Sequence, residues 1–294
     1  MKIAVIGKTG QLARAFATCV KLDGNIDAAF YGRDALDLTS DAQIISAFIE
    51  DLSVDAVIIA AAYTAVDKAE TDHDTAFAVN ASAPGFIAKS CAVKNMALLH
   101  VSTDYVFNGM ANKPYDVDAP IQPLGIYGRS KADGEAAVLA AHPKAAIVRT
   151  SWVFDGVGAN FFNTMLRVGA ARDSLTVVND QWGRPTHAGH LARAIIDMLP
   201  ALIGGTAPGL FHVTGTGPVI SWADFARAIF DISHSHRDHS VTVTNIPSSD
   251  YPTPAARPAY SALDTSKYES QFGALPDWQS GLKEAYKEWS LANA

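Results

Sequence analysis

Near its start the sequence reads KIAVIGKTGQLA, residues 2–13, an apolar run broken by a glycine turn and continued by a helical pattern. A short apolar run of this kind is typical of a buried strand in a parallel sheet. Gly7 permits a tight turn, Gly10 lets the backbone approach a ligand, and the small Ala13 lets the helix pack against the strand. This spacing predicts the first strand–turn–helix unit of a dinucleotide-binding fold, with a pyrophosphate at the helix N-terminus.

Strand and helix patterns alternate from this unit to about residue 150. Such alternation predicts an α/β protein with a doubly wound parallel sheet, that is, a Rossmann fold. Further strands are expected at 26–31, 55–61, 98–102 and 145–149, with helices between them. Beyond residue 150 the pattern loosens, although a helix at 187–199 and a strand at 209–213 look like a return to the sheet.

The domain organisation follows from this pattern. We predict a dinucleotide-binding Rossmann domain made of residues 1–150 plus about 187–217. A smaller substrate domain, discontinuous in sequence, is predicted from about 151–186 and 218–294.

Charge and composition exclude several classes of partner. The chain of 294 residues has a net charge of −7 and no basic run, which argues against nucleic acid and against an anionic membrane surface. No apolar run approaches the roughly 18 residues of a membrane span. Cys19 and Cys91 lie in unrelated helical stretches and suit a reducing compartment. Because the first strand begins at residue 2, a signal peptide is not expected, and we predict a cytoplasmic protein.

The candidate catalytic motif is Tyr127-Gly-Arg-Ser-Lys131. A tyrosine and a lysine four residues apart lie on one face of a helix, where the ammonium favours the phenolate and is expected to lower the tyrosine pKa. Ser102-Thr103-Asp104 follows an apolar strand, so it reaches the sheet edge at which such folds bind ligands. We predict Tyr127, Lys131 and Thr103 as catalytic residues. The alternatives are a surface pair that shares a helical turn, and a threonine that only caps a helix.

Two further stretches favour a dinucleotide. The strand at 26–31 ends in Tyr31-Gly32-Arg33-Asp34, where Arg33 suits the 2′-phosphate of NADPH, the alternative being a solvated loop arginine. Ala60-Ala61-Ala62 leaves room for a cofactor across the sheet edge. The histidine-rich segment 233–239 lacks carboxylates or thiolates at ligand spacing, so no metal site is predicted.

Several motifs together resemble the dTDP-4-dehydrorhamnose reductase family of the extended short-chain dehydrogenase/reductase superfamily. The resemblance covers nearly the whole chain. It rests on GKTGQL at 7–12, AAYTAVD at 61–67, STDYVF at 102–107, YGRSK at 127–131, RTSW at 149–152 and NDQWGRPT at 179–186.

The resemblance, with the glycine turn and Arg33, gives the full set of expected site residues. The expected cofactor-binding residues are Gly7, Gly10, Gln11, Leu12, Arg33, Asp37, Leu38, Ala60, Ala61, Ala62, Tyr63, Asn80, Tyr127 and Lys131. The expected substrate-binding residues are Thr103, Asp104, Tyr105, Trp152 and Arg257.

Membership in this family implies an oxidoreductase that reduces the C4 keto group of dTDP-4-dehydro-L-rhamnose with NADPH, or with NADH, to give dTDP-L-rhamnose. The product is a precursor of cell-envelope polysaccharide. Two alternatives remain: a nucleotide-sugar epimerase or dehydratase of the same superfamily, and a non-catalytic regulatory subunit. Metal-dependent dimers of the family carry glutamates where this chain has Ala15 and His190, so we expect a monomer or weak dimer without a bridging Mg²⁺.

Overall fold

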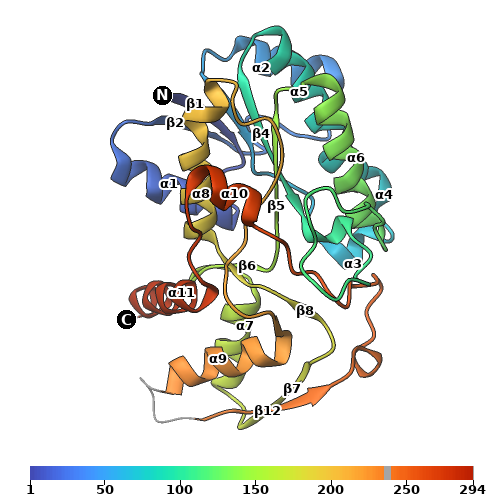
Figure 1. The fold of residues 1–294 in the computed structure, drawn as a ribbon, viewed down its shortest axis with the longest axis vertical. Helices are drawn as coiled ribbons and strands as arrows, with labels where there is room; N and C mark the ends of the chain where they lie inside the picture. Colours follow the sequence, from blue (N-terminus) through green and yellow to red (C-terminus); the bar gives the residue numbers. More distant parts are fainter. Residues whose placement is uncertain (235–239, 294) are drawn as a thin grey trace.

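A six-stranded parallel sheet forms the centre of the computed structural model, which describes residues 1–234 and 240–293 (Figure 1). The strand order is β10-β5-β4-β3-β1-β2, and every neighbouring pair is parallel. The strands are β1 (Lys2–Ile6), β2 (Asp27–Tyr31), β3 (Ala56–Ile59), β4 (Ala97–Thr103), β5 (Ala146–Thr150) and β10 (Gly209–His212). The order reverses between β1 and β3, and ligands of such sheets bind at the carboxyl ends beside that reversal.

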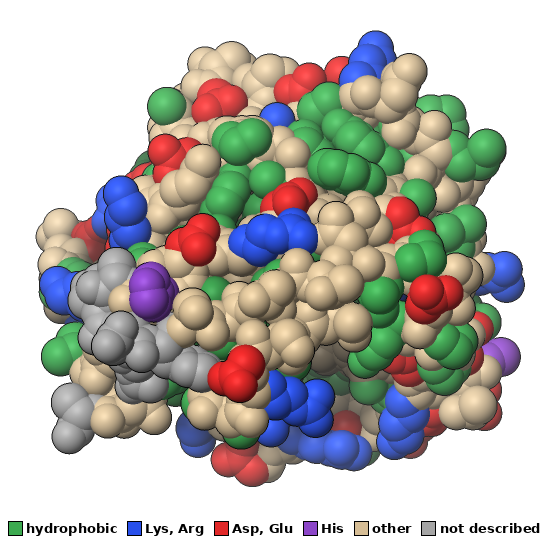
Figure 2. All heavy atoms as spheres, turned by 90° about the horizontal axis from the view of Figure 1, so that it is seen from below, with side chains coloured by type: hydrophobic (Ala, Val, Ile, Leu, Met, Phe, Trp, Pro, Cys, Tyr) green, Lys and Arg blue, Asp and Glu red, His purple; other side chains and the backbone are tan. Residues whose placement is uncertain are grey.

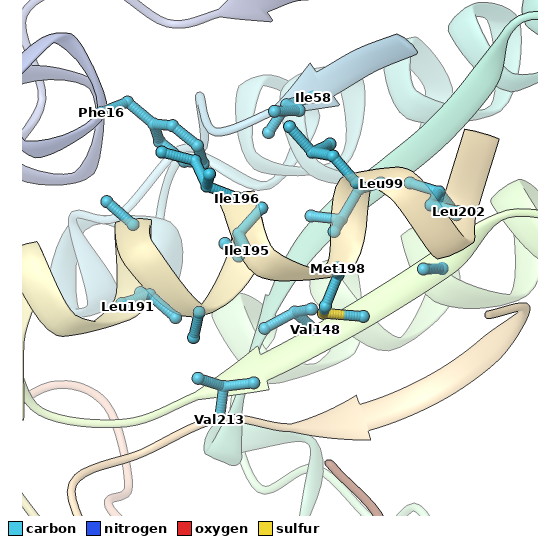
Figure 3. Close-up of a cluster of buried hydrophobic side chains, with 14 of the residues drawn as sticks. Phe16, Ile58, Leu99, Val148, Leu191, Ile195, Ile196, Met198, Leu202 and Val213 are labelled. Atoms are coloured by element: carbon cyan, nitrogen blue, oxygen red, sulfur yellow. The ribbon is translucent and has the colours of Figure 1, made fainter. Parts of the chain in front are cut away.

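Helices cover both faces of the sheet because successive strand residues point to opposite sides. On one face, Ile3 and Val5 pack against α1 (Gln11–Asp23) and α8 (Ala188–Ile203). Figure 3 shows this cluster, in which side chains of α8 lie between Phe16 and the strands. On the other face, Ala4 and Ile6 pack against α2 (Ala42–Asp51), α5 (Ala83–Val93) and α6 (Ile126–Ala141).

Between β3 and α5 the chain makes three short helical segments. These are α3 (Val66–Ala69), α4 (His73–Phe77) and a π-helical turn (Ala78–Ser82). The sequence pattern predicted helix through this region but not its division. The π-helical turn packs against α6, and it carries Asn80 into the interior, where its side chain is fully buried.

The last strand of the sheet comes from late in the chain. As predicted, residues 209–212 form β10 beside β5, in register with Gly209 opposite Ala146. A short helix, α10 (Ser266–Phe272), packs against α8 and β10, although the sequence analysis assigned residues 218–294 to the substrate domain. The exact domain division stays a prediction.

The remaining segments form a smaller part below the sheet in Figure 1. It contains three two-stranded sheets, which pair β6 (Val153–Phe154) with β9 (Thr186–His187), β7 (Ser174–Val178) with β12 (Thr242–Ile246), and β8 (Trp182–Gly183) with β11 (Ile220–Ser221). Helices α7 (Phe161–Gly169), α9 (Trp222–His234) and α11 (Trp278–Ala292) enclose an aromatic core around Phe162 and Phe225. Strand β12 was not predicted, although Val241 and Val243 alternate with threonines in the sequence and pack against the core beside α9.

Charged side chains of both signs lie on the surface (Figure 2). On the face shown in Figure 2, basic side chains lie among acidic and apolar ones, and several of them follow the lower edge of the view. Within residues 1–234 and 240–293, no helix is both long and apolar enough to cross a membrane. Most of the histidine-rich segment, residues 235–239, lies outside the described residues, so the metal prediction made there is not examined by the structure.

Candidate active site

An open cleft of about 850 Å³ runs along the carboxyl edge of the sheet. Its walls come from the ends of β1, β3, β4 and β5 and from the first turn of α1. Most of the residues that the sequence singled out line this cleft. They are Gly7, Gly10, Gln11, Leu12, Arg33, Asp37, Leu38, Ala60, Ala61, Ala62, Tyr63, Thr103, Asp104, Tyr105, Tyr127, Lys131 and Trp152. Asn80 and Arg257 are not part of its lining.

The glycine turn has the form that a pyrophosphate needs. Gly7 adopts a φ of 130°, and a Cβ there would lie 3.1 Å from the backbone nitrogen of Ala61. At Gly10 a Cβ would meet nothing within 4 Å, so the turn faces open space. Helix α1 starts next to it with no side-chain cap, which leaves its first N–H groups for an anion. These observations fit a dinucleotide.

One end of the cleft carries a cation and a carboxylate. The Arg33 Nε lies 2.9 Å from the Asp37 carboxylate, and the arginine side chain is 79% exposed. Thr39 donates to the other Asp37 oxygen from its backbone and from its hydroxyl. These hydrogen bonds and the Arg33 charge hold the pKa of Asp37 below its usual value. The cleft therefore offers both an acceptor for ribose hydroxyls and a cation for a phosphate.

Asn80 braces the cleft wall from behind. Its side-chain oxygen accepts from the Tyr63 backbone N–H at 2.9 Å, and its amide donates to the Tyr63 carbonyl and to the Ser130 hydroxyl. Asn80 thus ties the end of β3 to α6, one residue before Lys131. In the structure it supports the wall beside Tyr63 instead of forming its surface.

Tyr127 sits in the first turn of α6, and the edge of its ring meets the Tyr105 ring at 5.5 Å between centroids. Burial raises the pKa of Tyr127 to about 12, a hydrogen bond with Thr103 opposes this rise, and the nearby Asp104 adds to it. The sequence argument expected the lysine, together with the positive charge of a bound cofactor, to lower this pKa; in the structure the largest influence is desolvation, which raises it. A phenol with this pKa stays protonated at neutral pH, which is the state a general acid requires.

Lys131 lies one helical turn further along and is 1% exposed. Its Nζ donates to the Val101 carbonyl at 2.7 Å and lies 3.1 Å from His100 Nε2. Burial lowers the pKa of Lys131 to about 8, while the Glu135 carboxylate acts to raise it. The ammonium is therefore the main form at neutral pH and is lost above about pH 8.

Thr103 ends β4 and begins a 3₁₀ turn (Asp104–Val106). Its hydroxyl accepts from the Tyr105 N–H at 3.2 Å and donates to the Asp104 carboxylate at 3.0 Å. The capping role considered from the sequence is present, and the same hydroxyl also hydrogen-bonds Tyr127. Desolvation raises the pKa of the buried Asp104 to about 6.

Trp152 is held in a strained backbone conformation beside the cleft. Its φ is 48°, in the left-handed region that non-glycine residues rarely adopt. Its ring stacks on Trp222 with 3.6 Å between centroids, and a Cβ at Gly183 would lie 2.8 Å from it. Such over-determined strain clusters at functional sites. The stacked pair gives this end of the cleft a rigid aromatic wall.

Arg257 is bound by a residue from a distant part of the sequence. Its guanidinium binds both oxygens of Asp67 at 2.8 and 3.0 Å and also contacts Thr253. The Arg257 side chain is 23% exposed. Asp67 belongs to the AAYTAVD motif, 190 residues earlier in the chain. The sequence analysis placed Arg257 among the substrate-binding residues but gave no sign that a carboxylate orients it.

Several cleft residues were missed. Lys68, Asp72 and Thr75 line the cleft from α3 and α4, and Tyr63 donates from its hydroxyl to Asp72 at 3.0 Å. They follow the end of β3 on short helices whose direction the sequence pattern does not reveal. The AAYTAVD motif next to them was the available signal.

A cluster of histidines and glutamates lies where α8 meets α11. His190 Nε2 is 3.1 Å from Glu284, and the buried His187 lies 3.8 Å from Glu284 and 3.3 Å from Glu288. The candidate ligand atoms of His187, His190 and Glu284 lie within 4.8 Å of one another. This differs from the all-glutamate set that the family resemblance implies, since α1 contributes only Ala15.

The sequence matches known proteins over nearly its whole length. Residues 1–291 match the family described as RmlD substrate binding domain. A relative from Aggregatibacter actinomycetemcomitans, named dTDP-4-dehydrorhamnose reductase, is 40% identical over 294 residues. The match covers 98% of this chain and 99% of the relative.

Solved structures give the same picture. A dTDP-4-dehydrorhamnose reductase from Clostridium acetobutylicum has a TM-score of 0.91 at 35% identity, covering 99% of this chain and 100% of that one. A second, from Bacillus anthracis in complex with NADP, has a TM-score of 0.88 at 32% identity, covering 98% and 99%. The Rossmann fold predicted from the sequence is confirmed.

Proposed function

This chain belongs to the RmlD substrate binding domain family, and on that premise we propose that it is an NADPH-dependent oxidoreductase. It reduces the C4 keto group of dTDP-4-dehydro-L-rhamnose to give dTDP-L-rhamnose, the reaction indicated by the names of its relatives. The observation that carries the proposal is the meeting of Thr103, Tyr127 and Lys131 in one cleft with a glycine turn. The NADP complex of the Bacillus anthracis relative supports the cofactor.

Tyr127 acts as the general acid. The raised pKa keeps its phenol protonated at neutral pH, so the proton is available for the C4 oxygen as negative charge develops there. Thr103 hydrogen-bonds Tyr127. Its one hydroxyl hydrogen is donated to Asp104 in the structure, and in the proposal it turns to the same substrate oxygen when the keto sugar binds. NADPH, when bound, supplies the hydride for the C4 carbon.

Lys131 stabilises the phenolate that Tyr127 becomes after it has given up its proton. After proton transfer a phenolate is left in a buried site, where an unpaired charge is costly. The ammonium one helical turn away offsets that cost, and it also suits the cofactor ribose hydroxyls. The Lys131 ammonium is present below about pH 8, so at neutral pH both Tyr127 and Lys131 are in the protonation state that the reaction needs.

The substrate is proposed to lie between the aromatic wall and the late loop. Trp152 and Tyr105 offer faces for the sugar, and Arg257 suits the diphosphate because its planar fork binds two oxygens at once. Both terminal nitrogens of the guanidinium already donate to Asp67, so the part left for a diphosphate is the side edge formed by Nε and Nη2. In this view the ion pair orients the arginine instead of blocking it.

The test is turnover with substrate generated in situ. Loss of the nicotinamide absorbance, one equivalent per keto sugar consumed, together with identification of dTDP-L-rhamnose, supports the proposal. An epimerase or dehydratase recycles its cofactor and would consume none. A regulatory subunit would bind NADPH without turnover.

Arg33→Ala is expected to raise the KM for NADPH about tenfold and to leave the KM for NADH within about twofold. The lost charge-assisted hydrogen bond to the 2′-phosphate is worth about 1.4 kcal/mol. Initial rates with each cofactor measure both constants. Arg193→Ala, which removes another exposed arginine paired with an aspartate, serves as the control. Equal changes for both cofactors would contradict this role for Arg33.

We also propose a monomer or weak dimer that Mg²⁺ does not assemble. The support is Ala15 in place of a carboxylate and His190 already paired with Glu284. Sedimentation with Mg²⁺ and then with a chelator is expected to give the same mass. A dimer that forms only with Mg²⁺ would be the opposite result.

A further inference from the structure

His100 on β4 and Lys131 on α6 meet in the interior beside the cleft. His100 Nε2 lies 3.1 Å from Lys131 Nζ, and the two residues are 0% and 1% exposed. Among the described residues, the other ring nitrogen of His100, Nδ1, has no hydrogen-bond partner. The lysine contact is thus the one hydrogen bond of this imidazole, which argues against a histidine that simply satisfies the surrounding backbone.

Two of the hydrogen-bond partners of the Lys131 ammonium can be identified in the structure. An ammonium carries three N–H donors and no acceptor. One donates to the Val101 carbonyl at 2.7 Å, and a second is directed at His100 Nε2. Because the contact requires a lone pair on Nε2, the imidazole is neutral with its proton on Nδ1. With two donors fixed by neighbouring residues of β4, the ammonium no longer rotates freely.

We propose that His100 is a positioning residue: its neutral Nε2 fixes the Lys131 ammonium so that the third N–H is directed to the cleft. The inference rests on the role of Lys131 in the proposed function and goes beyond it, since His100 belongs to none of the motifs considered. His100 does not itself line the cleft, so it acts through the lysine.

The charges around the lysine agree with this arrangement. On α6, Tyr127 and Glu135 lie one turn to either side of Lys131. The 3₁₀ turn after β4 contributes Asp104. Arg149 of β5 is bound to Glu135. Burial and the Lys131 charge hold the pKa of His100 well below its ordinary value, so the ring stays neutral. A substitution that removes the lone pair of His100 Nε2 takes away an acceptor that stabilises the charged form of Lys131. The pKa of Lys131, already lowered to about 8, then falls further.

The test compares two variants of nearly equal side-chain volume, His100→Gln and His100→Met. Glutamine keeps an acceptor at the end of its side chain, whereas methionine offers only a weak one. The readouts are the pH dependence of NADPH binding, followed by nicotinamide fluorescence, and the pH profile of kcat. We expect H100M to move the alkaline limb of both profiles down by about one pH unit, and H100Q to keep it within about 0.3 unit of the parent.

The control is His212→Met, which removes another fully buried histidine from the sheet, one that lies beside Arg149. It is expected to leave the alkaline limb in place. His100→Phe provides a second variant without an acceptor should H100M fold poorly. Equal behaviour of H100Q and H100M, or no shift in H100M and H100F, would overturn the proposal. If the unmodified protein binds NADPH but reduces no keto sugar, the proposed function is refuted. The role of His100 is still tested in that case, because the pH dependence of NADPH binding does not need turnover.

Discussion

Tyr127→Phe is expected to lower kcat at least ~100-fold, because a positioned general acid contributes about 10²–10⁴ in rate. The substitution removes one hydroxyl and leaves the ring in contact with Tyr105. It takes away the proton that the C4 oxygen needs. Steady-state rates with saturating NADPH and keto sugar measure the effect.

Cofactor binding separates lost chemistry from lost structure. The affinity of the Y127F variant for NADPH, measured by nicotinamide fluorescence, should stay within about threefold of the parent, since the glycine turn and Lys131 are unchanged. Tyr105→Phe is the matched control: it removes a hydroxyl from the other ring of the same aromatic pair, and its kcat should fall no more than about tenfold. Near-normal turnover by Y127F would remove Tyr127 from the mechanism.

The fold could be predicted because its signals are local. Each core strand is a short apolar run, and Gly7 marks the end of the first strand with a conformation that other residues rarely adopt. The YxxxK spacing places Tyr127 and Lys131 on one helical face wherever that helix lies. These patterns need no knowledge of distant residues.

What the sequence missed depends on contacts between distant segments. Strand β12 pairs with β7, a partner more than sixty residues earlier in the chain, and its valine–threonine alternation at 241–244 does not reveal that partner. Arg257 is oriented by Asp67, and His100 looks like one polar residue within an apolar strand until Lys131 is placed against it. The upward shift of the Tyr127 pKa was missed for the same reason. The spacing places a lysine on the same helical face, but it does not reveal how deeply the phenol is buried.

The buried ion pair between Glu135 and Arg149 links α6, the helix that carries Tyr127 and Lys131, to the sheet. Arg149 of β5 binds both carboxylate oxygens, at 2.6 and 2.9 Å, and the two side chains are 3% and 1% exposed. The same guanidinium donates to the Val117 carbonyl and lies 5.1 Å from the Phe107 ring centre. Arg149 thus joins α6, the loop after β4 and the sheet.

Glu135→Gln is expected to lower the free energy of unfolding by about 3–5 kcal/mol, the largest effect on stability that we predict. Glutamine has nearly the same shape, so the loss comes from leaving the guanidinium charge buried without a counter-charge. Urea unfolding followed by fluorescence measures it, with NADPH absent so that ligand binding does not add stability.

Two comparisons give the E135Q result its meaning. Asp197→Asn breaks a pair of similar length with Arg193, but one that is exposed to solvent, and should cost about 0–1 kcal/mol. The double variant Glu135→Leu with Arg149→Met removes both charges and should be less destabilised than E135Q alone, because no buried charge is left unpaired. A loss below about 1 kcal/mol in E135Q would mean that water or another carboxylate reaches Arg149. Since Glu135 also raises the pKa of Lys131, a stable E135Q protein would still show its alkaline limb at lower pH.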